Sequence, residues 1–122
     1  LYNVAGDLTW DGDPLATISV TINTQAGTTY IPVLADAAKW IEMTNGAANT
    51  ITIPANGTAA FPIGTALNFE QAGAGATTIA ITTDTLNVNA NLTLVLNGQY
   101  ASATALKKTA TTWVLFGNLV AV

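Results

Sequence analysis

The sequence contains no histidine, no cysteine and no arginine among its 122 residues. Charged residues make up 8% of the chain, where about 25% is usual for a soluble domain. Histidine and cysteine are the commonest general bases, metal ligands and activated nucleophiles, so the many serine and threonine hydroxyls have no such residue to activate them. The composition therefore argues against an enzyme, predicts no cofactor, and favours a structural or binding protein.

Two further absences narrow the class of partner. Zero cysteines exclude a disulfide scaffold. The formal net charge is −4 with three lysines, so the chain cannot build the basic surface that nucleic acid or an anionic membrane requires.

The apolar runs are a few residues long, shorter than the roughly 18–20 that a membrane span needs. No signal peptide is visible, and a start at Leu1 rather than Met is expected of a processed product or a fragment.

Short runs of alternating apolar and polar residues are the main structural pattern, and this pattern is typical of half-buried strands. The last two runs are apolar on both faces, which predicts a central position in a sheet or a subunit contact. We expect them to supply the centre of the core through Leu92, Leu94, Leu96, Trp113 and Leu115. The runs are 17–22, 50–54, 67–70, 78–82, 86–89, 92–96 and 113–116.

Turn residues separate these runs. Four dipeptides suit a type I′ turn, in which both central residues have positive φ. Of these, Asn97-Gly98 is flanked by alternating residues on both sides and predicts a hairpin, and Gly73-Ala74-Gly75 predicts another reversal. The four dipeptides are Asp11-Gly12, Asn45-Gly46, Asn56-Gly57 and Asn97-Gly98.

Many short strands with frequent turns predict an all-β protein with a single antiparallel sandwich or barrel-like domain. Residues 34–39 are good helix formers, but they suffice for only one α or 3₁₀ turn linking two strands. Residues 1–14 lack regular alternation and are expected to form an irregular arm or loop, with the β-domain spanning 15–122.

Two acidic groups are candidates for chemistry. Asp7, Asp11 and Asp13 could supply oxygen ligands to Ca²⁺, but their spacing matches no calcium loop, and aspartates that form turns explain them better. Glu42 and Glu70 could hydrolyse a glycosidic bond if they faced each other across a sugar, but solvent-facing strand positions explain them as well. The sequence therefore predicts no catalytic, cofactor-binding or metal-binding residue.

The position of the aromatic residues distinguishes a sugar-binding surface from one that is buried against sister subunits. If Trp10, Tyr30 and Trp40 formed an exposed line, they could stack on a sugar, whereas aromatic residues of an all-β domain mostly fill the core. The low surface charge and the apolar end of the chain, residues 119–122, indicate burial against sister subunits. The low charge alone also fits a virion or extracellular surface rich in uncharged polar residues.

From Tyr30 to the C-terminus the chain resembles a β-rich structural module of tailed-bacteriophage virion proteins. The resemblance depends on the order and spacing of seven segments. It implies an all-β, non-enzymatic domain of a tail fibre, head fibre or capsid decoration protein. The segments are LADAAKWI (34–41), MTN (43–45), TITIP (50–54), FPIGT (61–65), EQAGAG (70–75), GQY (98–100) and WVLFGNL (113–119).

The resemblance also implies partners. Such modules are commonly homotrimers that dock on other virion proteins, such as the major capsid protein or fibre and tail proteins. We therefore expect a protein of the virion surface that associates with itself. The alternative is a module at a fibre tip that binds a host receptor or a host-surface glycan.

Overall fold

The computed structural model describes residues 3–4, 7–10, 13–14 and 19–122, with side chains described from residue 19 onward. About half of the described residues lie in strands, and the helical content of this part is a single short 3₁₀ turn, which confirms a β-rich fold. The strands are β1 (Asn3–Val4), β2 (Asp7–Trp10), β3 (Asp13–Pro14), β4 (Ile22–Gln25), β5 (Thr29–Tyr30), β6 (Trp40–Met43), β7 (Asn49–Ile53), β8 (Ala66–Gln71), β9 (Thr77–Ile81), β10 (Thr85–Val88), β11 (Leu92–Leu96), β12 (Ser102–Thr109), β13 (Thr112–Gly117) and β14 (Leu119–Ala121).

The first three strands form a small antiparallel sheet of their own, in the order β1-β2-β3. They lie within residues 1–14, where the sequence predicted an irregular arm. Asp11 and Gly12 of this range lie outside the described residues, so the type I′ turn predicted there does too. The division into an arm and a domain over 15–122 stays a prediction.

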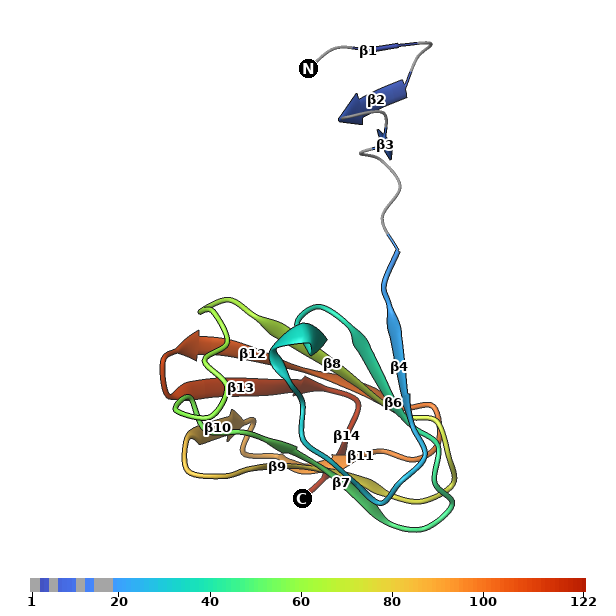
Figure 1. The fold of residues 1–122 in the computed structure, drawn as a ribbon. Coiled ribbons are helices and arrows are strands. Elements are labelled where there is room, and N and C mark those ends of the chain that lie inside the picture. Colours follow the sequence, from blue (N-terminus) through green and yellow to red (C-terminus); the bar gives the residue numbers. More distant parts are fainter. Residues whose placement is uncertain (1–2, 5–6, 11–12, 15–18) are drawn as a thin grey trace.

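The remaining strands form two sheets, ordered β10-β13-β12-β8-β6-β4 and β14-β11-β9-β7-β5 (Figure 1). From β4 to β12, successive strands alternate between the two sheets. Because the chain crosses to the other sheet and then returns, strands two apart in sequence become neighbours that run in the same direction. The pairs β4–β6, β6–β8, β5–β7 and β7–β9 are therefore parallel.

The prediction of an antiparallel domain was consequently wrong, because both sheets are mixed. Within these two sheets, every antiparallel pair includes β11 or β12: β12 pairs with β8 and β13, and β11 pairs with β9 and β14. Within residues 19–122, neither sheet closes into a barrel. In the same range, no helix is long and apolar enough to cross a membrane.

Alternation identified several strands correctly because one face of each is buried. In β7, Ile51 and Ile53 are fully buried, and in β8 the same holds for Leu67 and Phe69. The strand predicted over 17–22 instead begins at Ile22, and residues 17–18 lie outside the described residues. Buried side chains of both sheets belong to one hydrophobic cluster.

The predicted centre of the core is confirmed for three of its five residues. Leu96, Trp113 and Leu115 are buried, whereas Leu92 and Leu94 are half-buried and pack against the cluster from outside. The first four residues of β11 are half-buried, and its register against β14 shifts between Leu92 and Leu96. Both β11 and β13 occupy interior positions of their sheets, as their two apolar faces predicted.

The type I′ geometry predicted for the dipeptides is wrong at the three that the structure describes. Asn97-Gly98 joins β11 of one sheet to β12 of the other, so it forms no hairpin, and Gly98 alone of the pair has a positive φ, of 99°. Neither residue of Asn45-Gly46 or Asn56-Gly57 has a positive φ. The hairpin between β12 and β13 turns instead at residues 110–111, which carry no such dipeptide.

The reversal predicted at 73–75 is confirmed, and its glycines have a steric reason. A Cβ built on Gly75 would lie 1.9 Å from the carbonyl oxygen of Ala47, and one on Gly73 would lie 2.5 Å from that of Asn45. The loop between β8 and β9 therefore packs directly on the loop between β6 and β7. This close approach lets successive windings of the chain stack in register.

The predicted turn at 34–39 is confirmed as the 3₁₀ turn η1 (Leu34–Asp36), which links β5 to β6. The apolar C-terminus differs from expectation. Leu119 is buried in the core of its own chain, and β14 pairs with β11. Sister subunits are thus not needed to cover this leucine, whereas Val122 remains exposed.

Candidate functional site

An apolar groove beside η1 is the main candidate for a binding surface. Two connections form it, residues 31–35 between β5 and β6 and residues 54–59 between β7 and β8, and its volume is about 440 Å³. Three of the apolar side chains that line the groove are more than half exposed, although such residues are normally covered. They are Ile31, Val33 and Leu34.

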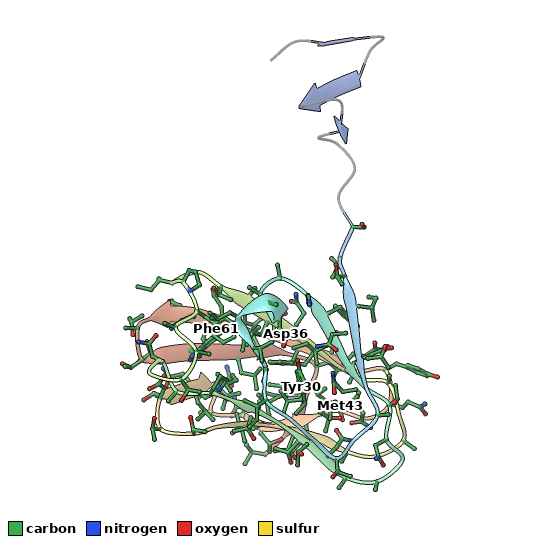
Figure 2. All side chains as sticks on the ribbon, in the orientation of Figure 1. Tyr30, Asp36, Met43 and Phe61 are labelled. Carbon is green, nitrogen blue, oxygen red and sulfur yellow. The ribbon has the colours of Figure 1, made fainter. Side chains whose placement is uncertain are left out.

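A buried carboxylate holds one wall of this groove in place. Asp36 is 1% exposed, and its Oδ2 accepts a hydrogen bond of 2.9 Å from the backbone N–H of Val33. Its Oδ1 accepts one of 2.9 Å from Nδ2 of Asn23 on β4. The hydroxyl of Tyr30 on β5 donates a further short hydrogen bond to Oδ2 (Figure 2). The carboxylate thereby ties β4, β5 and η1 together.

The network extends to both sides of Asp36. Gln25 donates from Nε2 to Oδ1 of Asn23 at 2.8 Å, so the Asn23 amide is held in one orientation. Lys39 Nζ lies 3.9 Å from Oδ1 of Asp36, which is an ion pair without a close hydrogen bond. Burial raises the pKa of the Tyr30 hydroxyl above 10.0, and the hydrogen bond to Asp36 raises it too, while the one from Asn23 lowers it. Tyr30 therefore acts as a neutral donor at physiological pH.

Glu42 and Glu70 are brought together by the fold. They lie opposite each other in the parallel pair β6–β8, on the face of the sheet that points away from the core. Glu42 accepts a hydrogen bond of 2.6 Å from the Thr24 hydroxyl, and Glu70 accepts one of 2.8 Å from Nε1 of Trp40. Each carboxylate therefore has a donor from a neighbouring strand that explains its position. The two are side by side on one sheet face rather than opposed across a cleft.

The other residues considered from the sequence are placed as follows. Tyr30 and Trp40 are half-buried and engaged in hydrogen bonds, so these two do not form the exposed line of aromatic residues considered from the sequence. The side chain of Trp10 lies outside the described residues, as do the side chains of Asp7 and Asp13 and all of Asp11. Among the residues that are described, no three acidic side chains are grouped closely enough to hold a metal ion.

The sequence-based prediction missed the groove. Ile31 and Val33 flank Pro32, so these apolar residues stand in a proline-containing connection without alternation. Alternation was the signal used to find buried apolar residues, and such connections have none. The sequence nonetheless contained a signal for an exposed apolar surface, namely apolar residues concentrated around a proline in a connection. Such residues have no strand face on which to be buried.

Comparison with known proteins adds no identity. No protein-family model matches this chain, and no similar sequence was found among curated proteins. The resemblance to a phage module therefore stays a prediction, and the function has to be argued from the fold and its surface.

Proposed function

We propose that this protein is a non-enzymatic structural protein of a bacteriophage virion surface, either a capsid decoration protein or a fibre domain. It associates with itself, most simply as a homotrimer, and docks on the virion. The observation that carries the proposal is the apolar groove beside η1 with its three exposed side chains, Ile31, Val33 and Leu34. Contiguous apolar surface of this kind marks interaction sites on soluble proteins.

The proposal includes the arrangement of the two sheets, which pack face to face as a sandwich. This arrangement is supported by the single hydrophobic cluster to which buried residues of both sheets contribute. The cluster occupies the inner faces, so the remaining surfaces, including the groove, are free for contacts with other chains. The low charge of the chain supports this use, because few charged side chains need to be desolvated.

The groove energetics favour an assembly with several contacts over a simple pair. Full burial of one large apolar side chain contributes about 1.5–3 kcal/mol, so a half-exposed one adds roughly 1 kcal/mol. Association of two chains costs about 4–15 kcal/mol before any such gain. Three exposed groove side chains alone are therefore too few for a tight dimer. A closed ring repeats the contact at every interface, and docking on a virion scaffold adds further contacts.

Sedimentation equilibrium over a wide concentration range tests the proposal. We expect a trimer for the natural protein and a monomer for Leu34→Asp, which places a charge at the groove. Ile22→Asp is the matched control, because Ile22 is 55% exposed against 54% for Leu34 but lies on β4, outside the residues that line the groove. A natural protein that stays monomeric at every concentration, alone and with purified capsids or fibres, would contradict the proposal.

A second candidate function is recognition of a host-surface glycan, favoured by one observation. Tyr100 is 72% exposed and has a φ of 69°, which is uncommon for a residue other than glycine. The strained backbone presents an open aromatic ring of the kind that stacks on sugars. Glycan-array binding that is lost in Tyr100→Ala and kept in Leu34→Asp would favour this function over self-association.

A further inference from the structure

A buried lysine stands among the inward-facing residues of β12. Ala103, Ala105 and Lys107 alternate along this strand on the face turned to the core, and Lys107 is 2% exposed. Its Nζ donates to Oδ1 of Asn56 at 2.6 Å and to the backbone carbonyl of Phe61 at 2.8 Å. No carboxylate oxygen of the described residues lies within 4.0 Å of this Nζ.

The surroundings of this amine are aromatic. The Nζ lies 5.7 Å from the centre of the Trp113 ring, and the Phe61 ring meets Trp113 edge-on, with their centres 5.7 Å apart. Nε1 of Trp113 is buried and has no hydrogen-bond partner among the described residues. Buried ammonium groups are normally paired with a carboxylate, and here two neutral oxygens and a ring face take that place. A bond that turned the amine into an amide would remove the charge from the core altogether.

We propose that Lys107 and Asn56 are joined by an intramolecular isopeptide bond. The ammonium of Lys107 must first give up one proton, because its nitrogen needs a free electron pair. Nζ then attacks Cγ of the Asn56 side chain, a new C–N bond forms, and the bond from Cγ to Nδ2 of Asn56 breaks. Nδ2 takes a second hydrogen from Nζ and leaves as ammonia, which binds the proton released first, so an ammonium and a primary amide become a secondary amide and an ammonium ion. The exchange needs no oxidant and no cofactor.

The geometry suits this attack. The Oδ1 atom is bonded to Cγ at about 1.23 Å, so the lysine Nζ lies less than about 4 Å from the carbon. This upper limit lies just above the roughly 3–3.5 Å that separates reacting atoms in near-attack position, and a fixed approach replaces the entropy cost of an encounter. Asn56 is itself held, since its backbone N–H donates to Oδ2 of Asp84 at 2.9 Å. Asp84 is in this way a positioning residue for the backbone from which the amide extends.

The bond would connect distant parts of the chain. Residues 56 and 107 are 51 positions apart, and they join the connection after β7 of one sheet to β12 of the other. Closing so long a loop restricts the unfolded chain in the way a disulfide does. In a protein without cysteine, such a bond would supply covalent stability by another chemistry.

Mass spectrometry of the natural full chain tests the proposal, after incubation at neutral pH until the mass is constant. We expect an intact mass lower than the sequence mass by one ammonia, and after proteolysis a branched peptide that contains both Asn56 and Lys107. The full sequence mass would overturn the proposal. An ammonia loss without the branched peptide would also overturn it, because Asn56-Gly57 can form a cyclic imide with the same mass change.

Variants separate these two reactions. Lys107→Met keeps the length of the side chain without the amine, and Asn56→Ala removes the amide; both should restore the full calculated mass. Gly57→Ala slows imide formation and has open space around its Cβ, so it should keep the branched peptide. Should Lys107→Met fail to fold, the branched peptide in the natural chain and its absence in Asn56→Ala still decide the matter.

Discussion

Replacing Asp36 by alanine tests whether the buried carboxylate holds the groove wall. The substitution removes the acceptor of three hydrogen bonds, from the Val33 N–H, the Asn23 amide and the Tyr30 hydroxyl. Hydrogen bonds to a charged group contribute about 1.5–3 kcal/mol each. Removing one partner of a buried charged interaction typically costs about 3–5 kcal/mol of stability. We expect a cost of this size for Asp36→Ala, because the donors left without an acceptor can recover only part of their hydration.

A loss of this size is measurable by urea denaturation at a fixed protein concentration, followed by tryptophan fluorescence. With a denaturant slope of about 2 kcal/mol per molar urea, a loss of about 4 kcal/mol lowers the midpoint by about 2 M. It is also a large part of the roughly 5–15 kcal/mol that stabilises a domain. The Asp36→Ala variant should in addition lose self-association, because η1 carries Leu34 of the groove.

The control is Glu42→Ala, which removes a carboxylate with a single side-chain donor on the outer sheet face. We expect it to cost less than about 1 kcal/mol, as surface substitutions usually do. If Asp36→Ala cost no more than Glu42→Ala, the carboxylate network would not be what holds β4, β5 and η1 together.

Three further predictions concern packing and pH. Gly75→Ala should destabilise strongly in thermal unfolding, because its Cβ would overlap a backbone carbonyl, whereas Gly46→Ala has open space and should be nearly neutral; equal melting temperatures would refute the stacking of the two loops. Leu67→Ala should cost about 2–5 kcal/mol in urea, and Leu94→Ala, which is half-buried, clearly less; the reverse order would refute the placement of the core. The pKa of Tyr30 is raised in the folded chain, so its contribution to stability is complete below about pH 10 and is lost as the pH rises through the folded-state pKa. The stability advantage of the natural protein over Tyr30→Phe should therefore shrink in alkaline urea titrations, and a constant difference would contradict the assignment.

The strands that could be predicted from sequence are those in which alternation and burial coincide. Residues 49–53 and 66–71 alternate because one side of each strand faces the core, and this relation is local. The choice of strand partner is not local. Asn97-Gly98 carries a hairpin signal, yet the chain crosses there to the other sheet, while the real hairpin turns at residues 110–111 without such a signal. Turn chemistry constrains φ but does not decide which strands pair.

The candidate sites were hidden from sequence for a different reason. The groove residues stand in connections, where no periodicity marks an apolar residue as exposed. Lys107 occupies a position that alternation assigns to the core. Lysine is almost never fully buried, so the residue type predicted a side chain exposed to solvent. Only the arrangement in space, which brings residue 56 to residue 107, reveals the pair.

The winding of the chain between two sheets has a consequence for the rate of folding. Parallel neighbours in these sheets are distant in sequence: Ile22 pairs with Trp40, and Trp40 pairs with Asn68. Domains dominated by such non-local pairing fold in milliseconds to seconds, slower than helical domains of similar size. The one local pairing within the two sheets, β12 with β13, lies near the C-terminal end. Because β12 also supplies the antiparallel neighbour of β8, a nascent chain released before residue 102 lacks both this quickest nucleus and a partner for the middle of its larger sheet.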